Sequence, residues 1–184
     1  MSRIILLTDF SEEYAKNLLK GIVKYSLEQT PLVLCKMPFS YRVKQGVEGV
    51  LEWAKEWKAD GIIAQFYNTD DVSIFKKNGI AAIAQDFKER FTEIPNITGA
   101  HHLAGRMGAD YFVRKGFKNF AFYGYKNIVW SKERCDGYKD ELAWHNNGYR
   151  FYEYQNEDFS ELWYYDSEPL IRWLESLPKP IAMM

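Results

Sequence analysis

The chain has few cysteines and no excess of charge of either sign. Its two cysteines, Cys35 and Cys135, lie far apart in the 184-residue sequence, and no secretion signal precedes them. We therefore expect reduced thiols and a cytoplasmic location. The net charge is −1, from 24 Lys and Arg against 25 Asp and Glu, and no long basic run occurs. These residues do not support a nucleic-acid-binding surface of their own.

Long apolar runs are also missing. The apolar start Ile4–Leu7 ends at Thr8 and Asp9, which makes it too short for the core of a signal peptide. No segment approaches the roughly 20 apolar residues that a membrane helix needs. We expect no membrane partner.

The sequence motifs of several enzyme classes are absent. There is no phosphate-binding loop, no Gly-x-Gly-x-x-Gly dinucleotide turn, no Gly-x-Ser-x-Gly nucleophile elbow and no close Cys/His zinc set. Gln65 stands where a phospho-receiver domain needs an acceptor Asp, and Asp9, Glu12 and Glu13 would repel the phosphate of a flavodoxin cofactor. We predict no catalytic residues and no cofactor.

Histidine does not suggest a metal site either. His101 and His102 are adjacent at the start of an expected helix, so their side chains point in different directions. His145 is expected near the end of another helix, where a cation is favoured without any ligand. We predict no bound metal.

What the sequence does contain is a regular alternation of strand-like and helix-like segments. Short apolar runs alternate with segments whose apolar residues recur at helical spacing. Strands are expected at 3–8, 32–36, 62–64, 80–84, 97–98, 119–123, 149–155 and 180–184. Helices are expected at 12–27, 44–57, 70–78, 100–115, 132–146 and 167–176.

This alternation predicts an α/β protein with doubly wound parallel sheets. The continuous apolar character of Ile4–Leu7, Gly61–Ala64 and Ile80–Ala84 agrees, because parallel strands are covered on both faces. We place the N-terminal lobe at residues 1–98 and the start of a C-terminal lobe at 99–184. The second lobe has only three expected strands and ends on one without a helix, so we expect it to be incomplete.

Polar and aromatic residues follow the expected strands, at the edge where open α/β sheets bind ligands. They are Thr8, Asp9, Phe10, Ser11 and Tyr14 after the first strand, Gln65, Phe66 and Tyr67 after the third, Gln85 and Asp86 after the fourth, and Tyr125, Trp130, Glu133 and Arg134 after the strand at 119–123. Such a mixture suits a sugar, whose hydroxyls pair with polar groups and whose C–H faces stack on aromatic rings.

Each of these residues also has a structural interpretation. Asp9 with Ser11 can cap the helix that follows. Tyr14 lies on the apolar stripe of that helix, which favours the core over a ligand. Trp130 can be a packing residue, and Arg134 can be a solvated charge on its helix.

The chain resembles the ligand-binding region of LacI/GalR-type regulators, and within that group the xylose operon regulators. The likeness rests on Tyr14 with Gly21, on Asp60-Gly61-Ile62-Ile63-Ala64, and on Lys115-Gly116-Phe117 before Phe120-Ala121-Phe122-Tyr123-Gly124. It continues in Trp130 and Glu133-Arg134.

The resemblance implies a type I periplasmic-binding-protein-like fold of two lobes with a sugar, D-xylose or another pentose, in the cleft between them. It implies ligand-binding roles for Asp9, Tyr14, Gln65, Trp130 and Arg134. His101 lies where many relatives carry an Asp. The family reads operator DNA through a separate AraC-type domain, which this chain lacks, and tends to form homodimers. This stretch alone is expected to bind sugar weakly or not at all.

Two other functions stay open. The chain can be the sugar-binding protein of a transport system, or an α/β enzyme whose remaining part carries the chemistry.

Overall fold

The computed structural model describes residues 1–11, 13–85, 89–156 and 167–184, so Asp86 and Glu12 lie outside the described residues. The chain divides into two compact units, Met1–Thr98 (unit 1) and Gly99–Met184 (unit 2). Each unit has its own parallel sheet and its own buried cluster of apolar side chains.

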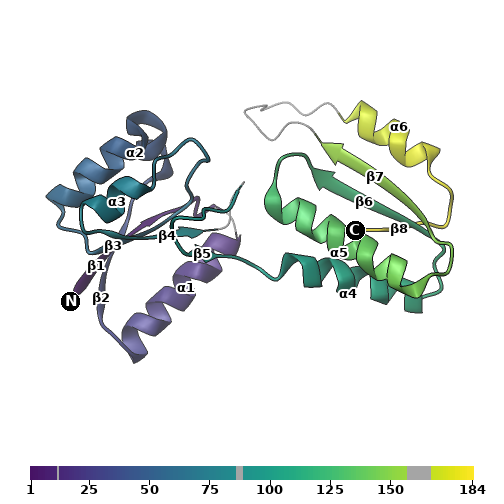
Figure 1. Ribbon diagram of the computed structural model, residues 1–184, viewed down its shortest axis with the longest axis horizontal. Helices are drawn as coiled ribbons and strands as arrows, with labels where there is room; N and C mark the ends of the chain where they lie inside the picture. Colours follow the sequence, from purple (N-terminus) through teal and green to yellow (C-terminus); the bar gives the residue numbers. More distant parts are fainter. Residues whose placement is uncertain (12, 86–88, 157–166) are drawn as a thin grey trace. The chain divides into compact units, whose positions relative to one another are not determined.

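Unit 1 contains a five-stranded parallel sheet in the order β2-β1-β3-β4-β5 (Figure 1). The strands are β1 (Ser2–Leu7), β2 (Leu32–Lys36), β3 (Gly61–Ala64), β4 (Ala81–Gln85) and β5 (Asn96–Ile97). The pairs Leu7↔Ala64 and Ala64↔Ala84 align the carboxyl ends of three neighbouring strands. The polar residues that follow these strands therefore lie side by side at one edge of the sheet.

Helices lie on both faces of this sheet (Figure 1). They are α1 (Glu13–Glu28), α2 (Phe39–Glu56) and α3 (Ser73–Lys77). On one face, Ile5, Ile62 and Phe75 belong to the buried cluster formed with α2 and α3. On the other face, α1 and the sheet border an open cavity of about 520 Å³, lined by Ile4, Leu18, Ile22, Ile63 and Ile83 among others. The predicted doubly wound α/β fold is confirmed here.

The helix predicted at 44–57 begins earlier than expected. The segment Phe39–Glu56 is helical except at Gly46, whose φ of 69° interrupts it. A left-handed φ is accessible to Gly because it has no Cβ. The first helical turns contain the polar residues Ser40, Arg42 and Lys44, which obscured the helix in the apolar pattern.

Unit 2 has a three-stranded parallel sheet in the order β7-β6-β8 among the described residues. Its strands are β6 (Asn119–Tyr125), β7 (Arg150–Asn156) and β8 (Ala182–Met183), and its helices are α4 (His101–Arg114), α5 (Val129–His145) and α6 (Glu168–Ser176). Phe120, Tyr138 and Leu142 form the buried cluster between β6 and α5. Helix α6 lies beside β7 (Figure 1). Its Trp173 ring is 5.2 Å from the Tyr154 ring of that strand.

Helix α5 begins at Val129, earlier than the predicted start at residue 132. Trp130 therefore lies in the first turn of the helix, one turn before Arg134. In the described part of the chain, every helix is too short or too polar to cross a lipid bilayer.

Candidate functional site

Asp9 and Gln65 meet at the carboxyl edge of the unit 1 sheet. The backbone N–H of Asp9 donates to Gln65 Oε1 at 2.9 Å, although 56 positions separate the two residues. The Asp9 carboxylate accepts a hydrogen bond from the backbone N–H of Ser11 at 2.9 Å. Hydrogen bonds from the Ser11 hydroxyl and N–H lower the pKa of Asp9. An exposed, charged carboxylate therefore stands at this edge at neutral pH.

Gln65 belongs to a row of three buried polar side chains, Thr8, Gln65 and Gln85, which we call the polar row. Each follows or ends one of the aligned strands β1, β3 and β4. Thr8 Oγ1 and both amide atoms of Gln85 have no hydrogen-bond partner among the described residues. A buried polar atom without a partner costs about 1–3 kcal/mol, so a ligand that bonds these atoms would recover that free energy.

Thr8 and Gln85 were not among the predicted ligand-binding residues, although both were noted at strand ends. The signal that identifies them is register. Each occupies the same position relative to its strand as Gln65, and a polar side chain there interrupts an otherwise apolar strand.

Tyr14 lies on the first turn of α1, and its side chain is 44% exposed. Its interpretation as a core residue is therefore wrong. The apolar stripe that suggested it faces the cavity under α1, whose lining includes Leu18, Ile22 and Tyr25 but not Tyr14. A ligand-binding role for Tyr14 stays a prediction. The cavity itself offers a sugar little besides Asn17, since its other lining groups are almost all apolar.

In unit 2, Trp130 and Arg134 are brought together at the start of α5. The Arg134 guanidinium carbon lies 4.9 Å from the centre of the Trp130 ring. The ring of Tyr125, the last residue of β6, lies 5.9 Å from the Trp130 ring and meets it edge-on. Arg134 is half-buried and lies against the Trp130 ring, while its role in ligand binding stays a prediction.

His101 joins this group from the first turn of α4. Arg134 Nε donates to His101 Nδ1 at 3.3 Å, and the His101 and Trp130 rings are 6.4 Å apart. As the acceptor of this bond, Nδ1 holds the imidazole beside the Arg134 guanidinium. We call Tyr125, Trp130, Arg134 and His101 the Arg134 group. His101 was not predicted as a site residue, because the contact bridges 33 positions of sequence.

The backbones of α4 and α5 approach closely beside this group. A Cβ added to Gly105 would lie 2.0 Å from the Arg134 carbonyl oxygen, and one added to Gly137 would lie 2.0 Å from the His102 carbonyl oxygen. No side chain fits at either position, so the two glycines allow the contact that holds His101 beside Arg134.

The loop between β6 and α5 is fixed by Ser131, which is buried in the first turn of α5. Its hydroxyl oxygen accepts the backbone N–H of Tyr125 at 2.8 Å. This hydrogen bond ties the end of the strand to the helix and thereby sets the position of Trp130 relative to Tyr125. The result is an aromatic surface bordered by guanidinium and imidazole groups.

Comparisons with known proteins place the fold. No family model matches the chain, and no curated protein matches it in sequence. Among solved structures, it is similar to the Cra transcriptional dual regulator from Pseudomonas putida in complex with fructose 1-phosphate. That match has a TM-score of 0.70 at 15% identity and covers 100% of this chain and 68% of that one.

Two further structures are similar. A xylose-binding transcription activator, xylR, gives a TM-score of 0.71 at 21% identity over 98% of this chain and 45% of that one. A periplasmic binding protein/LacI transcriptional regulator from Alkaliphilus metalliredigens, complexed with D-xylulofuranose, gives 0.61 at 15% identity over 99% of this chain and 76% of that one.

The chain thus spans between 45% and 76% of the length of these three proteins. Taken with the parallel sheets and the helices on both faces of each sheet, the likeness shows that the chain has a type I periplasmic-binding-protein-like fold.

Proposed function

We propose that this chain is the sugar-binding part of a transcription regulator, that it is not an enzyme, and that its effector is D-xylose or a related pentose. The observation that carries the proposal is the Arg134 group. Arg134 lies over Trp130 and beside His101 at the carboxyl end of β6. An aromatic face beside fixed donors matches a sugar, which presents C–H faces and hydroxyl groups together.

Unit 1 offers hydrogen-bonding groups of the same kind. The amide of Gln85 can both donate and accept, as can the hydroxyl of Thr8, and all three atoms concerned lack partners among the described residues. Sugar hydroxyls also both donate and accept, so they can satisfy such groups. Asp9 adds a charged acceptor at the same edge.

The charge of Asp9 favours a neutral sugar over a sugar phosphate. Its lowered pKa keeps the carboxylate ionised at neutral pH, where it would repel a phosphate group. This separates the proposed effector from fructose 1-phosphate, which is bound to the similar Cra structure.

The test is calorimetric titration of D-xylose into the protein produced from the intact gene. Replacing Arg134 by Ala is expected to weaken binding by about 1.5–3 kcal/mol, because a charge-assisted hydrogen bond and a stacked group are lost. The matched control is Lys132→Ala on the same helix, whose side chain is exposed and pairs with Asp136. It should leave the affinity unchanged. Unchanged affinity in Arg134→Ala would remove the proposed role.

The ligand panel tests the effector. Among D-xylose, D-ribose, L-arabinose and fructose 1-phosphate, the tightest binding is expected for one of the three pentoses. Tighter binding of fructose 1-phosphate would contradict the neutral-sugar proposal.

A transport role is the second candidate. It is favoured by the solved structure from Alkaliphilus metalliredigens, whose name covers both periplasmic binding proteins and regulators. We propose the regulator, located in the cytoplasm and acting as a homodimer, with operator DNA bound through a separate domain. A sugar-dependent change in DNA binding by the intact gene product would support the regulator. Sugar uptake lost on deletion of the gene, with unchanged transcription, would support transport.

A further inference from the structure

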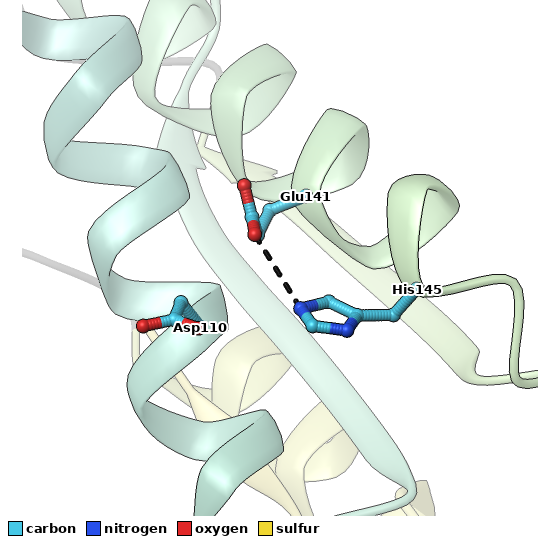
Figure 2. A group of neighbouring side chains, drawn as sticks. All are labelled: Asp110, Glu141 and His145. Atoms are coloured by element: carbon cyan, nitrogen blue, oxygen red, sulfur yellow. Dashed lines mark ion pairs between the residues drawn. The ribbon is translucent and has the colours of Figure 1, made fainter.

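Three side chains with metal-ligating atoms lie close together between α4 and α5. They come from the C-terminal parts of the two helices, whereas His101 and Arg134 lie nearer the N-terminal ends. Asp110 comes from α4, and Glu141 and His145 come from successive turns of α5 (Figure 2). One ligand atom from each residue lies within 4.8 Å of the other two. Glu141 and His145 are at i and i+4, so they project from the same face of their helix.

The imidazole of His145 is directed at the carboxylates. Its Nε2 lies 3.4 Å from Glu141 Oε1 and is shielded from solvent without a hydrogen-bond partner among the described residues. Figure 2 shows this ion pair as a dashed line. The Glu141 side chain is 10% exposed. Imidazole nitrogen and carboxylate oxygen both bind Zn²⁺, so these three side chains offer one nitrogen and two carboxylate ligands to such an ion.

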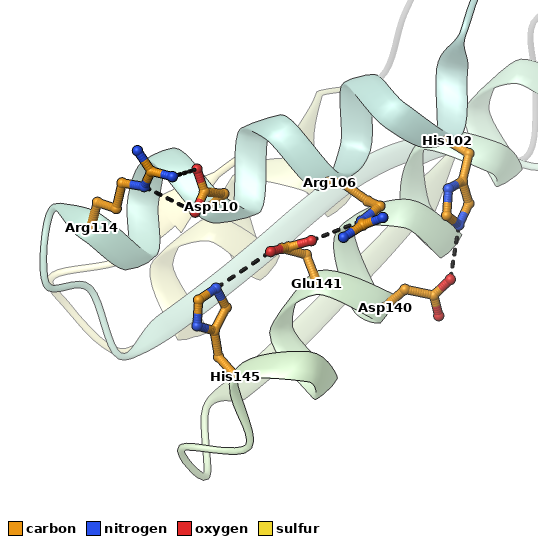
Figure 3. A network of polar contacts seen from close by, with 7 residues as sticks. All are labelled: His102, Arg106, Asp110, Arg114, Asp140, Glu141 and His145. Carbon is orange, nitrogen blue, oxygen red and sulfur yellow. Dashed lines mark hydrogen bonds and ion pairs between the residues drawn. The ribbon is translucent and has the colours of Figure 1, made fainter.

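Two arginines pair with the carboxylates, one of them inside the cluster and one at its exposed edge (Figure 3). Arg106 Nε donates to Glu141 Oε2 at 2.8 Å, which orients the carboxylate and leaves Oε1 on the side of His145. Arg114 pairs with both oxygens of Asp110, but its side chain is 77% exposed. Exposed ion pairs contribute little, so a divalent cation can displace Arg114 from Asp110.

We propose that Asp110, Glu141 Oε1 and His145 Nε2 form a binding site for a divalent transition metal of the Zn²⁺ class. Bonds of about 2.0–2.2 Å place tetrahedral ligand atoms roughly 3.4 Å apart, so the side chains need only close in by small rotations. The imidazole favours such an ion over Mg²⁺ or Ca²⁺, which prefer oxygen ligands alone. This proposal differs from the expectation from sequence that no metal is bound.

The bound ion would link α4 to α5. The same two helices carry His101 and Arg134 at their other ends, and their backbones already touch at Gly105 and Gly137. Metal binding to the folded form alone would raise the stability of unit 2. The proposal rests on these contacts and not on the proposed sugar-binding function.

The experiment is a titration of chelator-treated, tag-free protein with ZnCl₂, followed by calorimetry and by the thermal midpoint. Visible absorption of the Co²⁺ form reports the coordination geometry. We expect one Zn²⁺ per chain, an upward shift of the midpoint, and the intense absorption of tetrahedral Co²⁺. His145→Gln should weaken binding at least about tenfold, as should Asp110→Asn.

Two further variants test the metal site even if His145→Gln or Asp110→Asn misfolds. Arg114→Ala removes the competing cation and should strengthen Zn²⁺ binding. His102→Gln changes an exposed histidine on α4 that pairs with Asp140 at 2.8 Å outside the site, and it should bind like the parent (Figure 3). The proposal is overturned if the parent binds no Zn²⁺, if His102→Gln loses as much affinity as His145→Gln, or if Arg114→Ala binds more weakly.

Discussion

At the scale of single residues, the ion pair Arg42–Asp70 is the most fully buried charge pair among the described residues. Arg42 bonds both carboxylate oxygens of Asp70, and both side chains are less than one-tenth exposed. Asp70 also accepts the backbone N–H of Tyr67 at 2.7 Å, and the Arg42 guanidinium lies 4.0 Å from the Tyr67 ring. The pair therefore fixes the loop that follows Gln65 and β3.

We predict that Arg42→Ala destabilises unit 1 by about 3–5 kcal/mol, because it leaves the Asp70 carboxylate buried without its cation. The measurement is urea unfolding followed by circular dichroism. Lys24→Ala, which removes the exposed pair with Glu28, is the control and should change stability by less than about 0.5 kcal/mol. Equal effects of the two substitutions would contradict this account of the buried pair.

The two cysteines differ in burial and in thiol pKa. Burial raises the pKa of Cys35, and burial with the neighbouring Glu153 raises the pKa of Cys135 to about 11. The reactive thiolate is thus scarce at neutral pH, and Cys135 is almost fully buried.

We predict that iodoacetamide at pH 8 modifies Cys35 well before Cys135 in the folded protein, with peptide mass spectrometry as the measurement. Reaction at Cys135 should appear only in denaturant or as the pH approaches 11. Equal labelling of both thiols in the folded state at pH 8 would contradict the burial of Cys135.

At the scale of elements, the glycine-mediated contact of α4 with α5 determines where the Arg134 group lies. Gly105 and Gly137 bring the two backbones within van der Waals contact, so a methyl group at either position would overlap a carbonyl oxygen of the other helix. Helix propensity does not account for either glycine, because Gly in a helix interior is about 0.5–1 kcal/mol less favourable than Ala. Packing between helices outweighs that local preference.

We predict opposite effects for two Gly→Ala substitutions in helices. Gly137→Ala should destabilise unit 2 by about 1–3 kcal/mol, because the helices must separate. It should also weaken sugar binding, since the separation moves His101 away from Arg134. Gly21→Ala in α1 meets nothing within 4 Å and should stabilise by about 0.5–1 kcal/mol. Thermal and urea unfolding measure both, and a stabilising Gly137→Ala would contradict the close packing.

At the scale of the whole molecule, the chain consists of two units, and each unit contains its own sheet. Unit 1 buries Ile5, Val50 and Phe75 in one cluster, and unit 2 buries Phe120 and Tyr138 in another. Within unit 1, β1 lies in the interior of the sheet order and β5 at its edge, and each of the five strands pairs with a strand from residues 1–98.

We predict that residues 1–98 fold when produced alone. The expected result is a circular dichroism spectrum with mixed helix and strand, cooperative unfolding in urea, and amide protons of β1 and β3 protected from exchange. Protection absent from β1, with no cooperative transition, would show that the first unit depends on the rest of the chain.

The sequence by itself determined the α/β class, the parallel sheets and most element positions. These follow from local spacing: continuous apolar strands such as Ile4–Leu7 alternate with helices of regular apolar period. The alternation also placed Asp9 and Gln65 at strand ends, and it placed Trp130 and Arg134 after β6. The helix starts at Phe39 and Val129 were predicted too late, because a single first turn is too short to show a helical period of apolar residues.

Only the tertiary structure decided which distant side chains meet. Arg134 bonds His101, Gln85 joins the buried row with Thr8, and Asp110 faces Glu141 and His145 across two helices. None of these contacts is local, and each depends on sheet register or on the glycine contact between α4 and α5. Such contacts arise from packing between residues that are distant in the sequence, and a local period of apolar residues does not predict which of them meet.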